Sequence, residues 1–101
     1  MAGKEFARFL RPMLRISADD LTGELISFRL DGQVTGRWVK LLRRTCEAQL
    51  KKGKRVNIDL RNVSFVDRDG VALLRSLTDR RVEILNALPF ISEQIRKGTP
   101  Q

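Results

Sequence analysis

The stretch of residues 56–77 constrains the fold most, because its hydrophobic period changes once, at a polar corner. Residues 56–60 alternate apolar and polar side chains, which is the two-residue period of a strand with one buried face. Further along, Val71, Leu74 and Leu77 recur at three-residue intervals, which is typical of a helix that lays one side on a core. The sequence therefore predicts a strand, a short turn and a helix.

The corner between them reads Asp67-Arg68-Asp69-Gly70. An acidic side chain just before a helix can accept hydrogen bonds from the first N–H groups, which have no partner within the helix. Gly70 is expected to let the backbone turn tightly, since glycine adopts conformations that other residues avoid. We predict that the corner presents the start of the helix outward.

With these residues the chain resembles the STAS domain family, which includes anti-sigma factor antagonists and the cytoplasmic tails of sulfate transporters. The resemblance rests on the pattern V-S-F-V-D-x-x-G-V-x-x-L after a strand. In the antagonists the corner usually reads Asp-Ser-Ser-Gly, and the Ser before the glycine is the target of a kinase. Here Asp69 occupies that phosphoacceptor position and Arg68 the preceding one, so phosphorylation of a serine there is chemically excluded.

The segments before this stretch predict a hairpin and a helix. Alternating residues between 13 and 30 indicate two antiparallel strands, with the turn at residues 19–23. A polar connection over residues 31–36 follows, in which Thr35 is the expected N-cap of an amphipathic helix over residues 37–52.

Beyond the corner helix, residues 79–81 interrupt the pattern and residues 82–85 indicate a short final strand. Asn86 is the expected N-cap of a last helix that runs to about Arg96, with Pro89 in its first turn. The order is β-β-α-β-α-β-α. We therefore predict an α/β, STAS-like fold, a mixed four-stranded sheet with three main helices mainly on one face.

Length and composition fit one domain. A chain of 101 residues with 42% hydrophobic content can bury a single core. The predicted domain spans residues 13–97, between an N-terminal arm of residues 1–12 and a tail of residues 98–101. No apolar run approaches the ~18 residues that a membrane span needs. The single cysteine, Cys46, cannot form an internal disulfide, so a cytoplasmic protein is expected.

The inventory of reactive side chains is poor, since the chain has no histidine and no tyrosine. Cys46 lacks a histidine partner and is expected in the core. Asp67 and Asp69, together with Asp19 or Asp20, offer the carboxylates of a Mg²⁺ site like that of a phosphate-receiver domain. Such a domain needs a helix after its first strand, where this chain has a hairpin. We expect no enzymatic activity, no cofactor and no metal.

Recognition is the remaining role for the corner. The resemblance implies that a kinase-type anti-sigma factor docks at the start of the corner helix and that phosphorylation there weakens binding. The predicted partner-binding residues are Asp67, Arg68, Asp69, Gly70, Val71, Leu74 and Arg75. A carboxylate carries about −1 where a phosphate carries about −1.5 to −2, so Asp69 could imitate a permanently modified state, partly offset by Arg68. The alternative is that Asp69 only caps the helix.

Two other functions stay open. The same fold serves as a small STAS subunit on the ATPase of a lipid-transport ABC complex, which this chain also resembles in size. A formal charge of +8 would attract nucleic acid or another anionic surface. Trp38 is expected to anchor the 37–52 helix on the core rather than to stack on a base, which disfavours nucleic acid.

Overall fold

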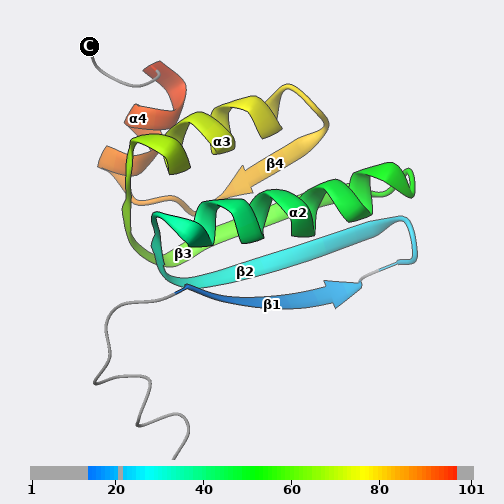
Figure 1. The fold of residues 1–101 in the computed structure, drawn as a ribbon. Coiled ribbons are helices and arrows are strands. Elements are labelled where there is room, and N and C mark those ends of the chain that lie inside the picture. Colours follow the sequence, from blue (N-terminus) through cyan, green and yellow to red (C-terminus); the bar gives the residue numbers. More distant parts are fainter. Residues whose placement is uncertain (1–13, 21, 98–101) are drawn as a thin grey trace, which may run out of the picture.

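The computed structural model describes residues 14–20 and 22–97 (Figure 1). The predicted N-terminal arm and the tail lie outside the described residues. The described elements are β1 (Leu14–Asp20), β2 (Leu25–Val34), α2 (Arg37–Lys51), β3 (Arg55–Val66), α3 (Arg68–Thr78), β4 (Val82–Leu85) and α4 (Pro89–Lys97). Their succession is the predicted β-β-α-β-α-β-α.

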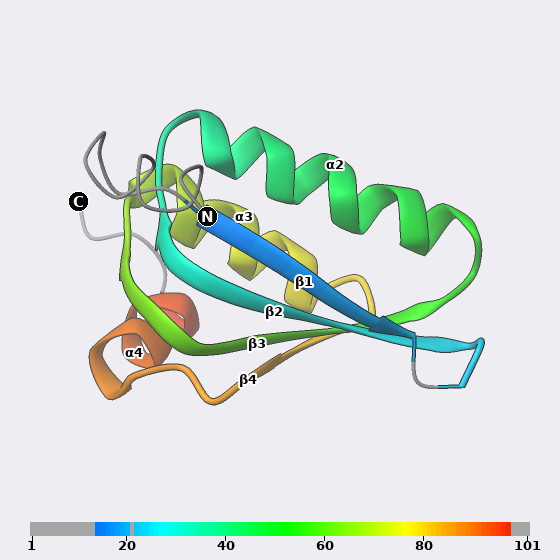
Figure 2. The same cartoon turned by 90° about the horizontal axis from the view of Figure 1, so that it is seen from below.

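The strands form one mixed sheet in the order β1-β2-β3-β4. β1 runs antiparallel to β2, whereas β2, β3 and β4 are parallel to one another. The crossovers β2-α2-β3 and β3-α3-β4 step in the same direction across the sheet. Crossovers between parallel strands are right-handed, so α2 and α3 lie on the same face of the sheet (Figure 2). α4 packs against α3. The predicted mixed sheet with helices mainly on one face is confirmed.

The core lies between that face of the sheet and the two helices. Alternate strand residues are buried there, including Phe28, Leu30, Val56, Ile58 and Leu60. The helices bury Val39, Leu42, Cys46, Val71, Leu73, Leu74 and Leu77 against them. The other face of the sheet carries the polar members of the alternation, among them the exposed Arg15, Arg29 and Arg61. This division explains the two-residue period of the strands.

β3 is longer than the predicted strand of residues 56–60, and it contains two irregularities. Residues 29–31 of β2 pair with residues 59–62 of β3, and residues 32–33 pair with residues 63–65. Each step inserts one extra residue into β3, which is a β-bulge. The buried residues of β3 are consequently three apart after the first bulge: Leu60, Val63 and Val66.

The predicted turns at residues 19–23 and 31–36 were too long, since β1 continues to Asp20 and β2 to Val34. Thr35 was also the wrong N-cap. Gly36 occupies that position with φ of 52°, and no side chain caps α2. The main-chain conformation, which favours glycine, decides where α2 begins.

The prediction that Asn86 caps the last helix was wrong. Asn86 lies before Pro89, with φ of 59°, and its side-chain amide instead donates to the Asp59 carboxylate at 3.2 Å. Pro89 is the first residue of α4, as expected. None of the helices in the described residues combines the length and apolarity that crossing a membrane requires.

Candidate functional site

Asp67 organises the corner where β3 ends and α3 begins. Its side chain is the N-cap of α3, and one carboxylate oxygen accepts a hydrogen bond from the Gly70 N–H at 2.8 Å. The other oxygen accepts from the Gly36 N–H at 3.0 Å. The Asp67 N–H in turn donates to the Val34 carbonyl at 3.1 Å. One residue thus fastens the β3–α3 corner to the β2–α2 connection.

Gly70 is needed for close packing, not for the tight turn that the sequence predicted. Among the described residues, the glycines with positive φ do not include Gly70. A Cβ at this position would lie 2.7 Å from the Val34 carbonyl oxygen and 2.6 Å from Val66 Cγ1. The absent side chain therefore allows α3 to start directly against the ends of β2 and β3.

The structure divides the predicted partner-binding residues into two groups. Gly70, Val71 and Leu74 are buried, the last two with exposed fractions of 1% and 0%. Their side of α3 builds the core and offers no surface to a partner. Arg68, Asp69 and Arg75 are exposed, while Asp67 is half-buried with both oxygens engaged.

Asp69 does not cap α3, because Asp67 does. The Asp69 side chain is exposed in the first turn of the helix, and no described residue pairs with its carboxylate. The partner contact predicted for this residue stays a prediction. Within the described part of the chain, this position presents an unpaired negative charge to solvent.

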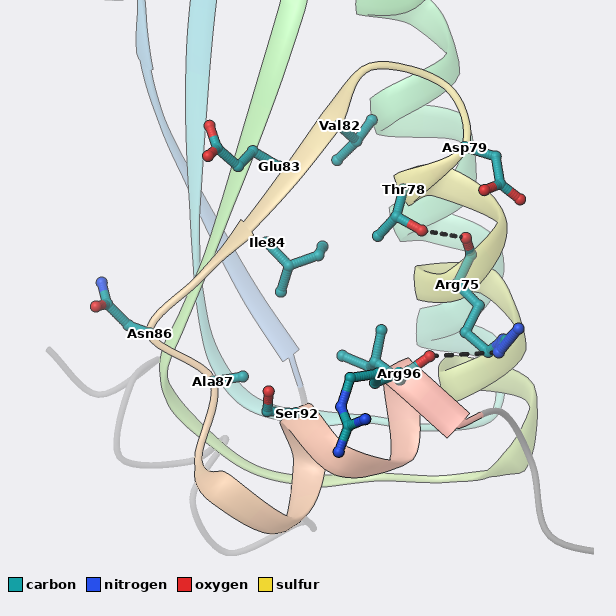
Figure 3. Close-up of a pocket in the computed structure, with 11 residues that line it drawn as sticks. Arg75, Thr78, Asp79, Val82, Glu83, Ile84, Asn86, Ala87, Ser92 and Arg96 are labelled. Carbon is teal, nitrogen blue, oxygen red and sulfur yellow. Dashed lines mark hydrogen bonds between the residues drawn. The ribbon is translucent and has the colours of Figure 1, made fainter.

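A surface pocket of about 610 Å³ lies between α3, β4 and α4 (Figure 3). Val82 and Ile84 line it from β4, and Arg75 reaches across its rim to donate to the Ile95 carbonyl at 3.4 Å. Sequence reasoning missed this pocket, since three separate elements contribute its walls. Only Arg75 was already a candidate residue.

Comparison with known proteins places this architecture. No protein-family model matches the chain, and neither does any curated protein. Among solved structures, the anti-sigma factor antagonist SpoIIAA in its unphosphorylated form superposes with a TM-score of 0.69 at 20% identity, covering 82% of this chain and 79% of that one. The chain adopts the STAS fold.

Two further structures of the STAS fold agree. The Bacillus cell fate determinant SpoIIAA in the phosphorylated form gives a TM-score of 0.66 at 20% identity, covering 82% of both chains. The STAS domain of an anti-sigma-factor antagonist from Rhodobacter sphaeroides gives 0.60 at 17% identity, covering 73% of this chain and 87% of that one. The predicted STAS-like architecture is thereby confirmed.

Within this STAS fold, Cys46 is a fully buried core residue of α2, as predicted. Burial is the main cause that raises the pKa of its thiol to about 12, so the reactive thiolate is scarce at neutral pH. The described residues contain no group of three or more His, Cys, Asp or Glu side chains that could hold a metal ion.

On the polar face of the sheet, Asp59 joins β3 to the segment after β4. Its carboxylate accepts from the Arg61 N–H at 2.9 Å and from the Asn86 amide. The Arg61 N–H is the main cause that lowers the pKa of Asp59, with Asn86 and the charges of Arg61 and Arg29 adding to it. This cluster ties β3 to the connection between β4 and α4.

Proposed function

We propose that this chain is a non-catalytic STAS-domain protein-interaction module, similar to an anti-sigma factor antagonist, and that it contacts its partner through the exposed start of α3. One observation carries the proposal. Asp67 supplies the helix cap, which leaves the Asp69 carboxylate exposed and unpaired among the described residues. A charged group that the fold does not use is available for recognition.

The similar structures support a protein partner. Two of them are of SpoIIAA, one called an anti-sigma factor antagonist in its unphosphorylated form and the other described in the phosphorylated form. In the antagonists that this chain resembles, a kinase phosphorylates the Ser before the corner glycine. Asp69 occupies that position here, so the negative charge at this position does not depend on phosphorylation.

The proposed contact surface consists of the exposed residues Arg68, Asp69 and Arg75. Arg75 is held by its hydrogen bond to the Ile95 carbonyl and lies at the rim of the pocket between α3 and α4. A partner that covers the start of α3 would meet the charges of both signs on Arg68 and Asp69, and one that reaches the last turn would also meet Arg75. Such a pattern sets orientation and partner choice.

The test is Asp69→Lys, assayed for binding to a kinase-type anti-sigma factor by calorimetry after circular dichroism has confirmed the fold. We expect affinity to fall at least about tenfold, because like charges facing each other in an interface cost several kcal/mol. Glu24→Lys is the matched control, since Glu24 is also exposed and lies just before β2, at the end of the sheet opposite the corner. Unchanged affinity for Asp69→Lys would remove the corner from the interface.

The ATPase of a lipid-transport ABC complex is the alternative client for the same fold. A pull-down with the intact chain distinguishes the two clients. Recovery of an ABC ATPase without an anti-sigma kinase would replace the first proposal by the second.

A further inference from the structure

The exposed side of α2 carries an unusual concentration of positive charge. The helix buries Val39, Leu42 and Cys46 and turns the opposite side to solvent. At 3.6 residues per turn, four exposed cations fall on one line along that opposite side. We call them the basic stripe: Arg37, Lys40, Arg44 and Lys51. Arg43 is exposed beside it.

Little in the described residues offsets this charge. Glu47 is the single acidic residue of α2, and its carboxylate already accepts two hydrogen bonds from the Arg80 guanidinium, at 2.7 and 3.1 Å. That hydrogen bonding is the main cause that lowers the pKa of Glu47, and the charge of Lys51 adds to it. No described carboxylate forms a salt bridge with a member of the basic stripe. Most of the stripe's charge therefore remains to attract an anionic partner.

Within the described part of the chain, no exposed aromatic ring lies on α2 beside the stripe. α2 and α3 lie side by side in one layer over the sheet (Figure 2), and the described part of the chain measures 38 × 37 × 21 Å. Among the described residues, the large exposed apolar side chains are Phe65, Leu88 and Phe90, which belong to β3, the segment before α4, and α4.

Trp38 is not available to stack on a base. Its ring is half-buried against the core, and the Arg37 guanidinium lies 5.9 Å from the ring centroid. Single-stranded nucleic acid is usually bound through exposed aromatic platforms, and duplexes through an element that enters a groove. A line of exposed cations along one side of a helix, without either feature, matches the distributed charge of an anionic surface better.

We propose that the basic stripe of α2 binds an anionic membrane surface, through charge alone and without insertion. Juxtaposed Lys and Arg side chains bind acidic phospholipids in this way, with each cation adding a similar increment. The stripe lies on α2, whereas the proposed protein contact lies at the start of α3. The two proposals can therefore fail independently.

The test is co-sedimentation of the intact chain with vesicles of phosphatidylcholine, with and without about 30% phosphatidylglycerol. The variant Lys40→Gln/Arg44→Gln/Lys51→Gln removes three of the four cations of the basic stripe while keeping the helix. Each cation contributes roughly fivefold in binding, so we expect about 100-fold weaker partitioning to anionic vesicles. Binding should also be lost at about 1 M salt, where the Debye length is about 3 Å.

The matched control is Arg15→Gln/Arg29→Gln/Arg61→Gln, which removes the same charge from the opposite, polar face of the sheet. We expect its partitioning to change by less than about threefold. An equal loss of vesicle binding in both variants would show an effect of net charge and would contradict the assignment of binding to the basic stripe. Absence of binding at low salt, or equal binding to neutral vesicles, would overturn the proposal. So would stripe-dependent binding to duplex DNA that is tighter than binding to the vesicles.

Discussion

At the scale of single residues, Asp67 determines how the corner is built. Its two carboxylate oxygens accept different hydrogen bonds, one from the first turn of α3 and one from the residue before α2. Asp69, two positions later, shares the charge but none of these bonds. The two carboxylates should consequently respond very differently to substitution.

Asp67→Ala is expected to lower the free energy of unfolding by about 1–2 kcal/mol, since it removes the cap and the partner of the Gly36 N–H. Asp67→Asn keeps one acceptor and should fall between that variant and the wild type. Asp69→Ala should change stability by less than about 0.5 kcal/mol. Urea denaturation measures all three. Equal losses at the two positions would contradict the assignment of the cap.

Gly70→Ala should destabilise the protein by about 1–3 kcal/mol, because the new methyl group would overlap the Val34 carbonyl and Val66. The sign of the change in stability is informative, since a Gly-to-Ala change inside a helix ordinarily stabilises by roughly 0.5–1 kcal/mol. Thermal unfolding of the variant distinguishes destabilisation from stabilisation. A higher melting temperature for the variant would show that the close packing has been misjudged.

At the scale of elements, sequence patterns identified each strand and helix but misplaced several of their ends. The alternation of residues 56–60 was reliable because it reflects one buried face. The bulges then moved the buried residues to a three-residue spacing that no strand template contains. The start of α2 and the conformation of Asn86 depend on main-chain angles and on the distant Asp59, which local patterns do not report.

α4 illustrates an element that depends on a single anchor. It has nine residues, too few for a stable isolated helix, and Ile91 is its one fully buried residue. Ile91→Ala should therefore cost about 2–5 kcal/mol. The adjacent Phe90 is 52% exposed, and Phe90→Ala should cost less than about 1 kcal/mol. If chemical denaturation gave similar losses for the two variants, α4 would be held by something other than Ile91.

At the scale of the whole molecule, the fold followed from the order of elements, whereas the functional surfaces followed only in part. The sequence located the corner, and the three-residue period of its helix predicted that Val71 and Leu74 pack on the core, where both are buried. The pocket beside Arg75 arises from packing between three elements, so it has no signature within one segment of chain.

The buried thiol of Cys46 makes the stability of the whole molecule decrease at alkaline pH. Burial raises the pKa of Cys46 from 9.0 to about 12. The contribution of the thiol to the free energy of unfolding is therefore intact below pH 9. It declines above pH 9, because the thiol loses its proton in the unfolded chain and keeps it in the folded one. Between those values the slope is about 1.4 kcal/mol per pH unit. Cys46→Ala should show a shallower decline between pH 9 and 10 in denaturant titrations. Parallel curves would contradict this assignment.

The bond between the Asp67 carboxylate and the Gly36 N–H joins two positions that are 31 residues apart in the chain. For anyone who grafts binding loops onto this scaffold, the two connections form one module. Exchanging the tetrapeptide of residues 67–70 alone would remove the hydrogen bond that holds the residue before α2. Both connections have to be transplanted together, with the aspartate and both glycines kept in place.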